Sequence, residues 1–316
     1  IPGRARASVL RTLAQNARVA RGVRDFAWDS SLPSPSQSSR DQTEATTHAP
    51  STITSTQNTF FLVRTLANMP LLSTLALKNP DTGVLAHVSA RGLVEFRFSL
   101  DLESACEASI EQVAEFLSLP HLRTLSGPSS LLCALVPGRP VERVTLHLTT
   151  PVYTGLLRPR EVMGALALST ATSDDATMGV RELNIVVGPD VDKRTTELVL
   201  IAAGERLGGS VSALEVSVLR DAETIGQEDL YAQITAVIWR FPNLRSLSLS
   251  HHHPTAPSSS SSTSPSPINT GAATVTISDV EHRHAGEPEE WHALCPSLRR
   301  VGMLSGEVWH ASASGT

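Results

Sequence analysis

Apolar side chains recur along this sequence in short runs that follow the pattern apolar-x-x-apolar-x-apolar, where x is any residue. The last two apolar positions of a run are two residues apart, which is the spacing that places side chains on one face of a β-strand. The runs begin at Val23, Leu72, Leu93, Leu122, Val141, Val180, Val211, Leu244 and Leu298. The run at Leu122 departs from the pattern at its last position only, which is Gly127. We therefore predict nine short strands.

The segments between the runs show a different period. Apolar residues spaced three and four apart, which form one stripe along a helix, occupy residues 10–17, 110–117 and 230–241. A proline stands just before four of the runs, at Pro70, Pro120, Pro242 and Pro296. Proline ends a helix and turns the chain, so each of these segments reads as a helix followed by a strand.

One helix and one short strand cannot bury their apolar faces alone, so repeated units of this kind are expected to stack. The sequence thus predicts an α/β fold, a leucine-rich-repeat-like solenoid in which a curved parallel sheet is backed by helices, over residues 1–316 as one domain. A doubly wound fold would need longer Val/Ile strands and a glycine-rich turn after an early strand, and the sequence has neither. Residues 29–57 and 251–273 are rich in Ser, Thr and Pro, and we predict that both are disordered insertions.

Three phrases resemble the degenerate leucine-rich repeats of F-box proteins from basidiomycete fungi: residues 69–77, 241–249 and 295–301. In that family a short strand with a glycine turn and a tryptophan follows the last repeat, which here looks like Ser305 to Trp309. The resemblance implies that the repeats present target proteins and that an F-box binds a ubiquitin-ligase adaptor. No Leu-Pro-x-Glu-type F-box motif is found, and because the chain begins at Ile1 without an initiator Met we expect the protein to continue upstream.

The composition of the chain limits the classes of partner that we expect. The net charge of −5 lacks the basic excess that nucleic acid requires, so no nucleic-acid partner is expected. Apolar runs are far shorter than the roughly 20 residues of a membrane helix, so no membrane association is expected. Cys106, Cys133 and Cys295 are far apart and read as packing residues, without a disulfide framework or zinc cluster. We expect an intracellular protein, cytoplasmic or nuclear.

Motifs that would carry chemistry are weak. His251 to His253 are adjacent and cannot easily converge on one metal ion, and His282, His284 and His292 with Glu281 read as solvated loop residues. Residues 204–209 read as a helix C-cap and turn, because they follow a helix and precede a strand. No Gly-x-Ser-x-Gly elbow, Walker sequence or His-Glu-x-x-His motif occurs. We expect no enzyme, no catalytic residue, no cofactor and no metal.

Three further sets of residues were interpreted from their sequence context. Arg4, Arg11 and Arg18 share one face of the first helix, either as a solvated stripe or as a dock for an upstream domain or acidic partner. Paired acids, Asp174-Asp175 and Glu287 with its neighbours, read as solvated charge on polar connections. The tryptophans at 239, 291 and 309 read as core or cap residues, with the last covering the end of the array.

The best-supported function is a non-catalytic protein-binding scaffold, the substrate-recognition part of an F-box ubiquitin-ligase adaptor, with an unknown target. A stand-alone interaction or structural repeat protein unconnected to ubiquitin is the alternative, and an enzyme with unrecognised motifs is a remote one. The candidate contact residues are the outward strand positions, which alternate with the buried ones. They are Glu95, Arg97, Arg143, Thr145, Glu182, Asn184, Glu215, Ser217, Arg245 and Ser248.

Overall fold

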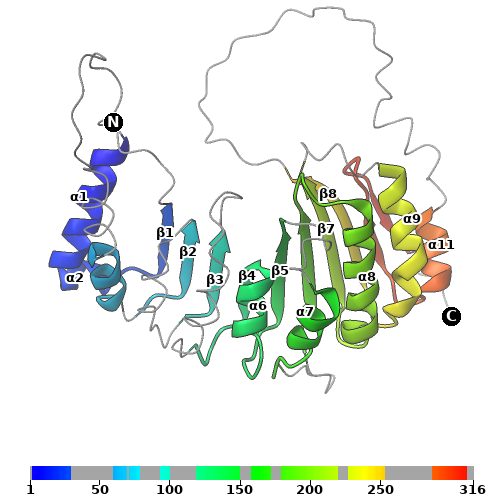
Figure 1. The fold of residues 1–316 in the computed structure, drawn as a ribbon, viewed down its shortest axis with the longest axis horizontal. Coiled ribbons are helices and arrows are strands. Elements are labelled where there is room, and N and C mark those ends of the chain that lie inside the picture. The colour runs from blue at the N-terminus through cyan, green and yellow to red at the C-terminus, as the bar shows by residue number, and fades with distance from the viewer. Residues whose placement is uncertain are drawn as a thin grey trace, which may run out of the picture. The chain divides into compact units, whose positions relative to one another are not determined.

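The computed structural model describes residues 2–29, 60–69, 71–78, 93–99, 119–149, 158–171, 179–219, 227–252 and 287–311. These residues form one ten-stranded sheet in which the strands lie in chain order from β1 to β10, with helices against it (Figure 1). The chain divides into two compact units. Unit 1 is residues 1–144 with 165–180, and unit 2 is residues 145–164 with 181–316. The expectation of a single repeat domain stays a prediction.

All nine runs form strands, and each strand begins at the third residue of its run. The strands are β1 (Asp25–Asp29), β2 (Thr74–Lys78), β3 (Glu95–Ser99), β4 (Thr124–Pro128), β5 (Arg143–Leu148), β6 (Glu182–Val187), β7 (Ala213–Leu219), β8 (Ser246–His252) and β9 (Arg300–Gly302). Strands β1 to β4 pair in parallel, as do β6 to β9. A tenth strand, β10 (Val308–His310), pairs antiparallel with β9. The predicted α/β class and the mostly parallel sheet backed by helices are confirmed.

A shared carbonyl explains why the regular ladder starts at the third residue of each run. The N–H groups of Arg245 and Ser246 both donate to the carbonyl oxygen of Ser212, at 2.8 and 3.1 Å. One acceptor therefore serves two donors where the chain turns from helix to strand, and one-to-one pairing begins only afterwards. The carbonyls that accept two such N–H groups elsewhere belong to Arg24, Ser73, Val94, Arg123, Arg181 and Arg245.

The fourth residue of each run forms the buried row of the sheet. In unit 2, Leu183, Leu214, Leu247 and Val301 are in register on neighbouring strands, and each is at most 3% exposed. In unit 1 the same row holds Leu75, Phe96 and Leu125, all fully buried, with half-buried Phe26 at its end. Burying one such side chain contributes about 1.5–3 kcal/mol, so the rows fix the register of the strands.

The helices of unit 1 begin with α1 (Pro2–Gln15) and α2 (Ala17–Ala20). The stripe of residues 10–17 predicts one helix, but the chain breaks at Asn16, whose side chain accepts a hydrogen bond from the N–H of Val19 as the N-cap of α2. The next described helix covers residues 60–67 and bonds to α1, with Thr65 Oγ1 donating to the carbonyl of Leu10 at 3.2 Å. The predicted helix at 110–117 lies outside the described residues.

Helix α6 (Ser129–Leu135) follows β4 directly and buries three leucines. Its last turn is held by Arg139, whose Nη1 donates to the carbonyl of Leu135 at 2.8 Å. Burial lowers the pKa of Arg139 from its usual value. The backbone of Arg139 also accepts from Ser169 Oγ at 3.1 Å, so this arginine joins the end of α6 to the segment that follows α7 (Pro159–Leu166).

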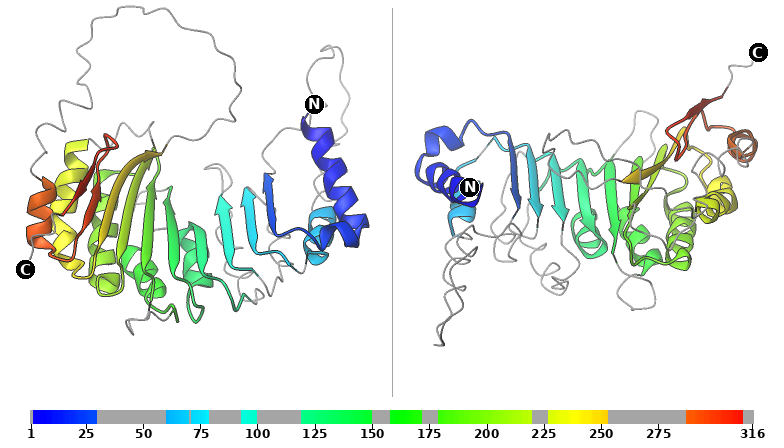
Figure 2. Two further views of the ribbon diagram at one scale, coloured as in Figure 1. Left: turned by 180° about the vertical axis from the view of Figure 1, so that it is seen from behind. Right: turned by 90° about the horizontal axis from the view of Figure 1, so that it is seen from above.

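In unit 2, helices α8 (Lys193–Leu207), α9 (Gln227–Val237) and α11 (Glu287–Leu294) lie against the same face of the sheet (Figure 2). The predicted stripe at 230–241 is buried, although its last residue, Phe241, follows a short 3-10 helix, η2 (Ile238–Arg240). Trp291 of α11 is fully buried, stacks on Tyr231 with ring centroids 5.8 Å apart and donates Nε1 to Thr235 Oγ1 at 2.7 Å. The core of unit 2 therefore lies between this helix layer and strands β6 to β9.

The last strand joins α11 through its tryptophan. Trp309 of β10 donates Nε1 to Glu289 Oε1 at 2.8 Å, and its ring lies 5.8 Å from that of His292. Gly306, at φ 87°, makes the turn that returns the chain from β9 to β10. Trp309 thus fastens the terminal hairpin to the last helix. That it covers the end of the array stays a prediction.

Several finer expectations are wrong. Trp239 is 54% exposed, with the guanidinium of Arg240 4.5 Å from its ring centroid, so it is not a core residue. Glu287 and its acidic neighbours belong to α11 and not to a polar connection. Strand β8 extends through His252, two residues into the segment expected to be disordered, and β1 includes Asp29. Residues 30–57 and 253–273, like Asp174 and Asp175, lie outside the described residues.

Residues 204–209 end α8 as predicted, but the reason is close packing and not a left-handed turn. Gly208 has φ −54°, and a Cβ atom there would lie 2.0 Å from the carbonyl oxygen of Arg240. A Cβ at Gly204 would lie 2.7 Å from the Cβ of Arg240. The two glycines therefore let η2 approach the end of α8.

Gly208→Ala is expected to lower the free energy of unfolding by about 1–3 kcal/mol, because the added methyl group must displace the backbone of η2. Gly209→Ala is the matched control, since no atom lies within 4 Å of a Cβ at that position. Thermal unfolding followed by circular dichroism measures both. Equal melting temperatures for the two variants would contradict this close approach.

Candidate functional site

The outward positions of β6, β7 and β8 form a hydrogen-bonding surface in unit 2, here called the polar face. Asn184, Glu215 and Ser248 lie in register across the three strands. The next outward row holds Val186, Ser217 and Ser250. The described helices α8, α9 and α11 pack on the opposite face, where the leucine row is buried (Figure 2). Outward alternation therefore places these polar side chains away from the helices.

Two serines flank the carboxylate of Glu215. Ser217 Oγ and Ser250 Oγ lie 2.9 Å apart, and each lies 3.4 Å from Glu215 Oε1. Glu215 is half-buried, and it forms no ion pair with any described residue. The centre of the polar face is thus a carboxylate held by hydroxyl groups, which suits hydrogen bonding to another polypeptide.

Asn184, beside Glu215, makes no side-chain hydrogen bond within the described part of the chain, and its Oδ1 is shielded from solvent without a donor. A shielded amide oxygen without a partner costs free energy. Asn184 is therefore a point on the polar face where the fold itself leaves hydrogen-bonding capacity unused.

Ten contact residues were predicted, and seven belong to unit 2. Thr145, Glu182, Asn184, Glu215 and Ser248 are strand residues at outward positions and are half-buried or exposed. Two placements need correction. Ser217 is outward but only 2% exposed, because Ser250 and Glu215 cover it. Arg245 is exposed but precedes β8, since the ladder starts one residue later.

The other three predicted residues belong to unit 1. Glu95 and Arg97 lie on β3 and form an ion pair with each other, and Arg143 is the exposed first residue of β5. A second ion pair joins Arg123 to Glu142 at the edge where β4 and β5 begin. Exposed pairs of this kind contribute at most about 1 kcal/mol. In unit 1, then, four of these charged side chains form ion pairs with one another.

The prediction missed Ser246 and Ser250, which are outward residues of β8. The alternation that identified Ser248 extends two residues in each direction, so the signal was present in the sequence. The Ser/Pro-rich composition after Leu249 favours a loop from His251 onward, which hides this signal, whereas β8 continues to His252.

The histidines and cysteines play structural parts where they are described. His251 and His252 are the last two residues of β8. His292 Nδ1 lies 2.9 Å from the carbonyl oxygen of Leu298. Cys295 is buried, and its Sγ lies 3.1 Å from the carbonyl oxygen of Phe241. Glu281, His282, His284 and Cys106 lie outside the described residues.

Within the residues that the structure describes, no three His, Cys, Asp or Glu side chains gather as metal ligands would. None of the helices in the described ranges has the length and apolar content needed to cross a lipid bilayer. Of the arginine stripe on the first helix, Arg11 lies over the ring of Phe61 at 5.7 Å and Arg18 is exposed. Arg11 thus contributes to packing between α1 and the helix at residues 60–67.

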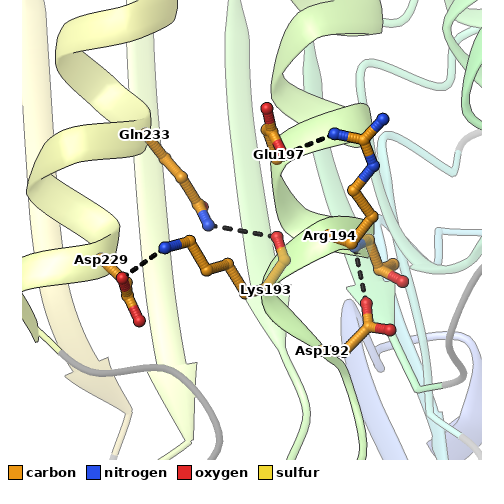
Figure 3. A network of polar contacts seen from close by, with 7 residues as sticks. Asp192, Lys193, Arg194, Glu197, Asp229 and Gln233 are labelled. Atoms are coloured by element: carbon orange, nitrogen blue, oxygen red, sulfur yellow. Dashed lines mark hydrogen bonds and ion pairs between the residues drawn. The ribbon is translucent and has the colours of Figure 1, made fainter.

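A polar network joins α8 to α9 on the helical side of unit 2 (Figure 3). Asp192 caps α8 by accepting from the N–H of Thr195 at 2.6 Å, and Gln233 of α9 donates Nε2 to the carbonyl of Lys193 at 3.1 Å. Lys193 also pairs with Asp229 of α9. Because each of these contacts ends on a helix terminus or a neighbouring helix, the network serves helix packing.

Comparison with known proteins adds no family assignment, because no family model matches the chain and no curated protein matches it.

Asp192→Ala is expected to lower the free energy of unfolding by about 1 kcal/mol, since it leaves the first turn of α8 without its side-chain acceptor. Asp190→Ala is the control, because Asp190 is exposed and accepts no hydrogen bond from the described residues. Urea unfolding followed by far-ultraviolet circular dichroism compares the two. A loss at Asp190 as large as that at Asp192 would contradict the capping role.

Proposed function

We propose that this chain is a non-catalytic protein-binding scaffold, a leucine-rich-repeat-like solenoid that presents the outward side of its strands to other proteins. The observation that carries the proposal is the order of the sheet: successive runs pair with their neighbours in the chain, and the described helices of unit 2 lie on one face only. In a stacked array this leaves a continuous row of outward side chains for contact.

The chemistry of the polar face supports a polypeptide partner. Serine hydroxyls, an asparagine amide and a carboxylate lie at neighbouring register positions, a mixture that hydrogen-bonds to backbone and side chains alike. A small-molecule site, by contrast, is typically a concave and mostly apolar pocket. Outward strand residues spaced about 4.8 Å from strand to strand suit an extended surface contact better.

The narrower proposal is that the scaffold recognises substrates for an F-box ubiquitin-ligase adaptor. It is supported by the resemblance of residues 69–77, 241–249 and 295–301 to the repeats of that family. The alternative, an interaction or structural repeat protein unconnected to ubiquitin, uses the same surface with different partners.

Affinity purification of the full-length protein tests both proposals. The variant Asn184→Arg with Ser248→Arg places two bulky charges on either side of Glu215. It is expected to reduce recovery of the bound proteins by at least about tenfold, because the two long side chains sterically obstruct a fitted partner and compete for the carboxylate of Glu215. Ala232→Arg with Ala293→Arg is the matched control, since both alanines are exposed on the helical side.

A ligase adaptor among the proteins recovered supports the narrower proposal, and its absence among otherwise retained partners supports the alternative. Equal recovery by wild type and the Asn184/Ser248 variant, with unchanged melting temperatures, would show that the polar face is not the binding surface.

A further inference from the structure

We propose that Trp239 and the charged residues beside it form a second binding surface, for an acidic segment of a partner protein that carries an aromatic side chain. Trp239, Arg240, Glu205 and Arg160 are together called the indole platform. The inference goes beyond the proposed function, because Trp239 belongs to η2, which contacts α8, α9 and α11 in the helix layer of unit 2. The polar face lies on the other side of the strands (Figure 2).

Trp239 differs from the other tryptophans of unit 2 in its exposure. Trp291 is fully buried and Trp309 is half-buried against α11, whereas 54% of Trp239 is exposed. Tryptophan is enriched among the residues that dominate binding at protein interfaces, because its ring offers a large contact area with few rotatable bonds. Trp239 is therefore the natural anchor for a partner on the helical side.

The ring of Trp239 is held in one orientation by two contacts. Its Nε1 donates to the carbonyl oxygen of Ala236 at 3.0 Å. The guanidinium of Arg240 lies over one face of the ring, 4.5 Å from its centroid. A side chain that is ordered before binding loses less conformational entropy when a partner arrives. The exposed part of the ring is thus prepared for contact by the fold itself.

Arg240 is in turn held by α8. A Cβ atom at Gly204 would lie 2.7 Å from Cβ of Arg240 and 3.0 Å from its Cδ, so the missing side chain leaves room for the arginine stem. Glu205, the next residue of α8, places Oε1 3.7 Å from Nη1 of Arg240. Gly204 and Glu205 therefore position the guanidinium that supports the ring of Trp239.

The platform carries more positive than negative charge. The carboxylate of Glu205 is shared, because its Oε2 also lies 3.4 Å from Nη2 of Arg160. Both distances exceed the 2.7–2.9 Å that is typical of a strong charge-assisted hydrogen bond. The Arg160 side chain is 73% exposed. Two guanidinium groups around one carboxylate leave donors for a second carboxylate, which an acidic partner supplies.

These features favour a polypeptide over a nucleic acid. Single-stranded nucleic acid is bound by several stacking rings along a basic groove, and its affinity grows with the number of phosphates neutralised. Among the described residues of unit 2, Trp239 is the only exposed Phe, Tyr or Trp side chain. The whole chain has a net charge of −5, which repels a polyanion at long range. One aromatic ring and one or two carboxylates from a short segment match the platform.

Fluorescence anisotropy with a labelled ten-residue peptide of Glu and Ser with one central Phe tests the inference on the full chain. The wild type is expected to bind it at low salt and to lose affinity as salt screens the charges. Replacing the Phe by Ala, or every Glu by Gln, is expected to weaken binding at least about tenfold, because each change removes one of the two contacts. Equal binding of the three peptides would overturn the inference.

Variants of the platform separate the ring from the charge. Trp239→Ala is expected to bind the Phe peptide at least about tenfold more weakly, with a melting temperature close to that of the wild type because the ring is exposed. Trp239→Phe keeps an aromatic face but loses the N–H that bonds to Ala236, so its affinity should lie between the two. Arg160→Gln should weaken binding at least about threefold.

Arg194→Gln is the matched control for Arg160→Gln. Arg194 is also an exposed arginine that pairs with a glutamate of α8, but it lies outside the platform. Val308→Ala is the control for Trp239→Ala, since Val308 is 44% exposed on β10. Both controls are expected to bind like the wild type. Unchanged affinity of Trp239→Ala, or equal losses for Arg160→Gln and Arg194→Gln, would contradict the proposed surface.

A ten-nucleotide oligothymidylate that binds more tightly than the Phe peptide would also overturn the inference, in favour of a nucleic-acid surface. Failure here is distinct from failure of the proposed function. If Trp239→Ala in the full-length protein keeps every partner that the wild type recovers, while the Asn184/Ser248 variant loses them, the scaffold proposal stands and the second surface falls.

Discussion

Burial of the fourth residue of each run, in register with the same residue of the next run, is the constraint on which the rest of the structure depends. In unit 2 it aligns Leu183, Leu214 and Leu247 beneath the helix layer. Because side chains alternate along a strand, this single alignment also fixes which residues point outward. A shift of one residue would bury Glu215 and expose Leu214, so the polar face exists only while the apolar row is buried.

The same alignment explains why the edge of the sheet carries charge. The second residue of each run lies where one carbonyl accepts two N–H groups, before one-to-one pairing begins. Its side chain is free of the core, so the sequence can place an arginine, a serine or a glutamate there. Unit 1 uses the freedom for an Arg–Glu pair and unit 2 for adjacent arginines. The fold determines the position, and the sequence determines the charge.

Much of the fold could be predicted because the spacing of apolar residues indicates strands and helices directly. The nine runs, the helix at residues 227–237 and the end of α8 all follow from local pattern and turn chemistry. Tertiary contacts could not be predicted from the sequence. Nothing in the sequence near Trp239 shows that its side chain stays exposed, with the guanidinium of Arg240 over one face of the ring. Gly208 reads as a turn glycine, although it is required by the approach of a backbone 32 residues later.

The candidate site was predictable in outline for the same reason. Alternation identified Asn184, Glu215 and Ser248, but it could not show that Ser217 is covered by its neighbours. Each strand begins at the third residue of its run, so Arg245, the second residue, lies before the ladder. The spacing of apolar residues does not reveal where the ladder begins. The hydrogen-bond pattern is needed to show that Glu142 is the neighbour of Arg123 and that Arg299 is the neighbour of Arg245.

A pair of double-mutant cycles on the buried row tests the central claim most directly. Leu214 and Leu247 lie on adjacent strands, whereas Leu183 and Leu247 are separated by β7. With alanine substitutions measured by urea unfolding, the adjacent pair should couple by at least about 0.5 kcal/mol, and the separated pair should add to within about 0.3–0.5 kcal/mol. Additive changes at Leu214 and Leu247, or equal coupling of both pairs, would contradict the in-register stacking of neighbouring runs.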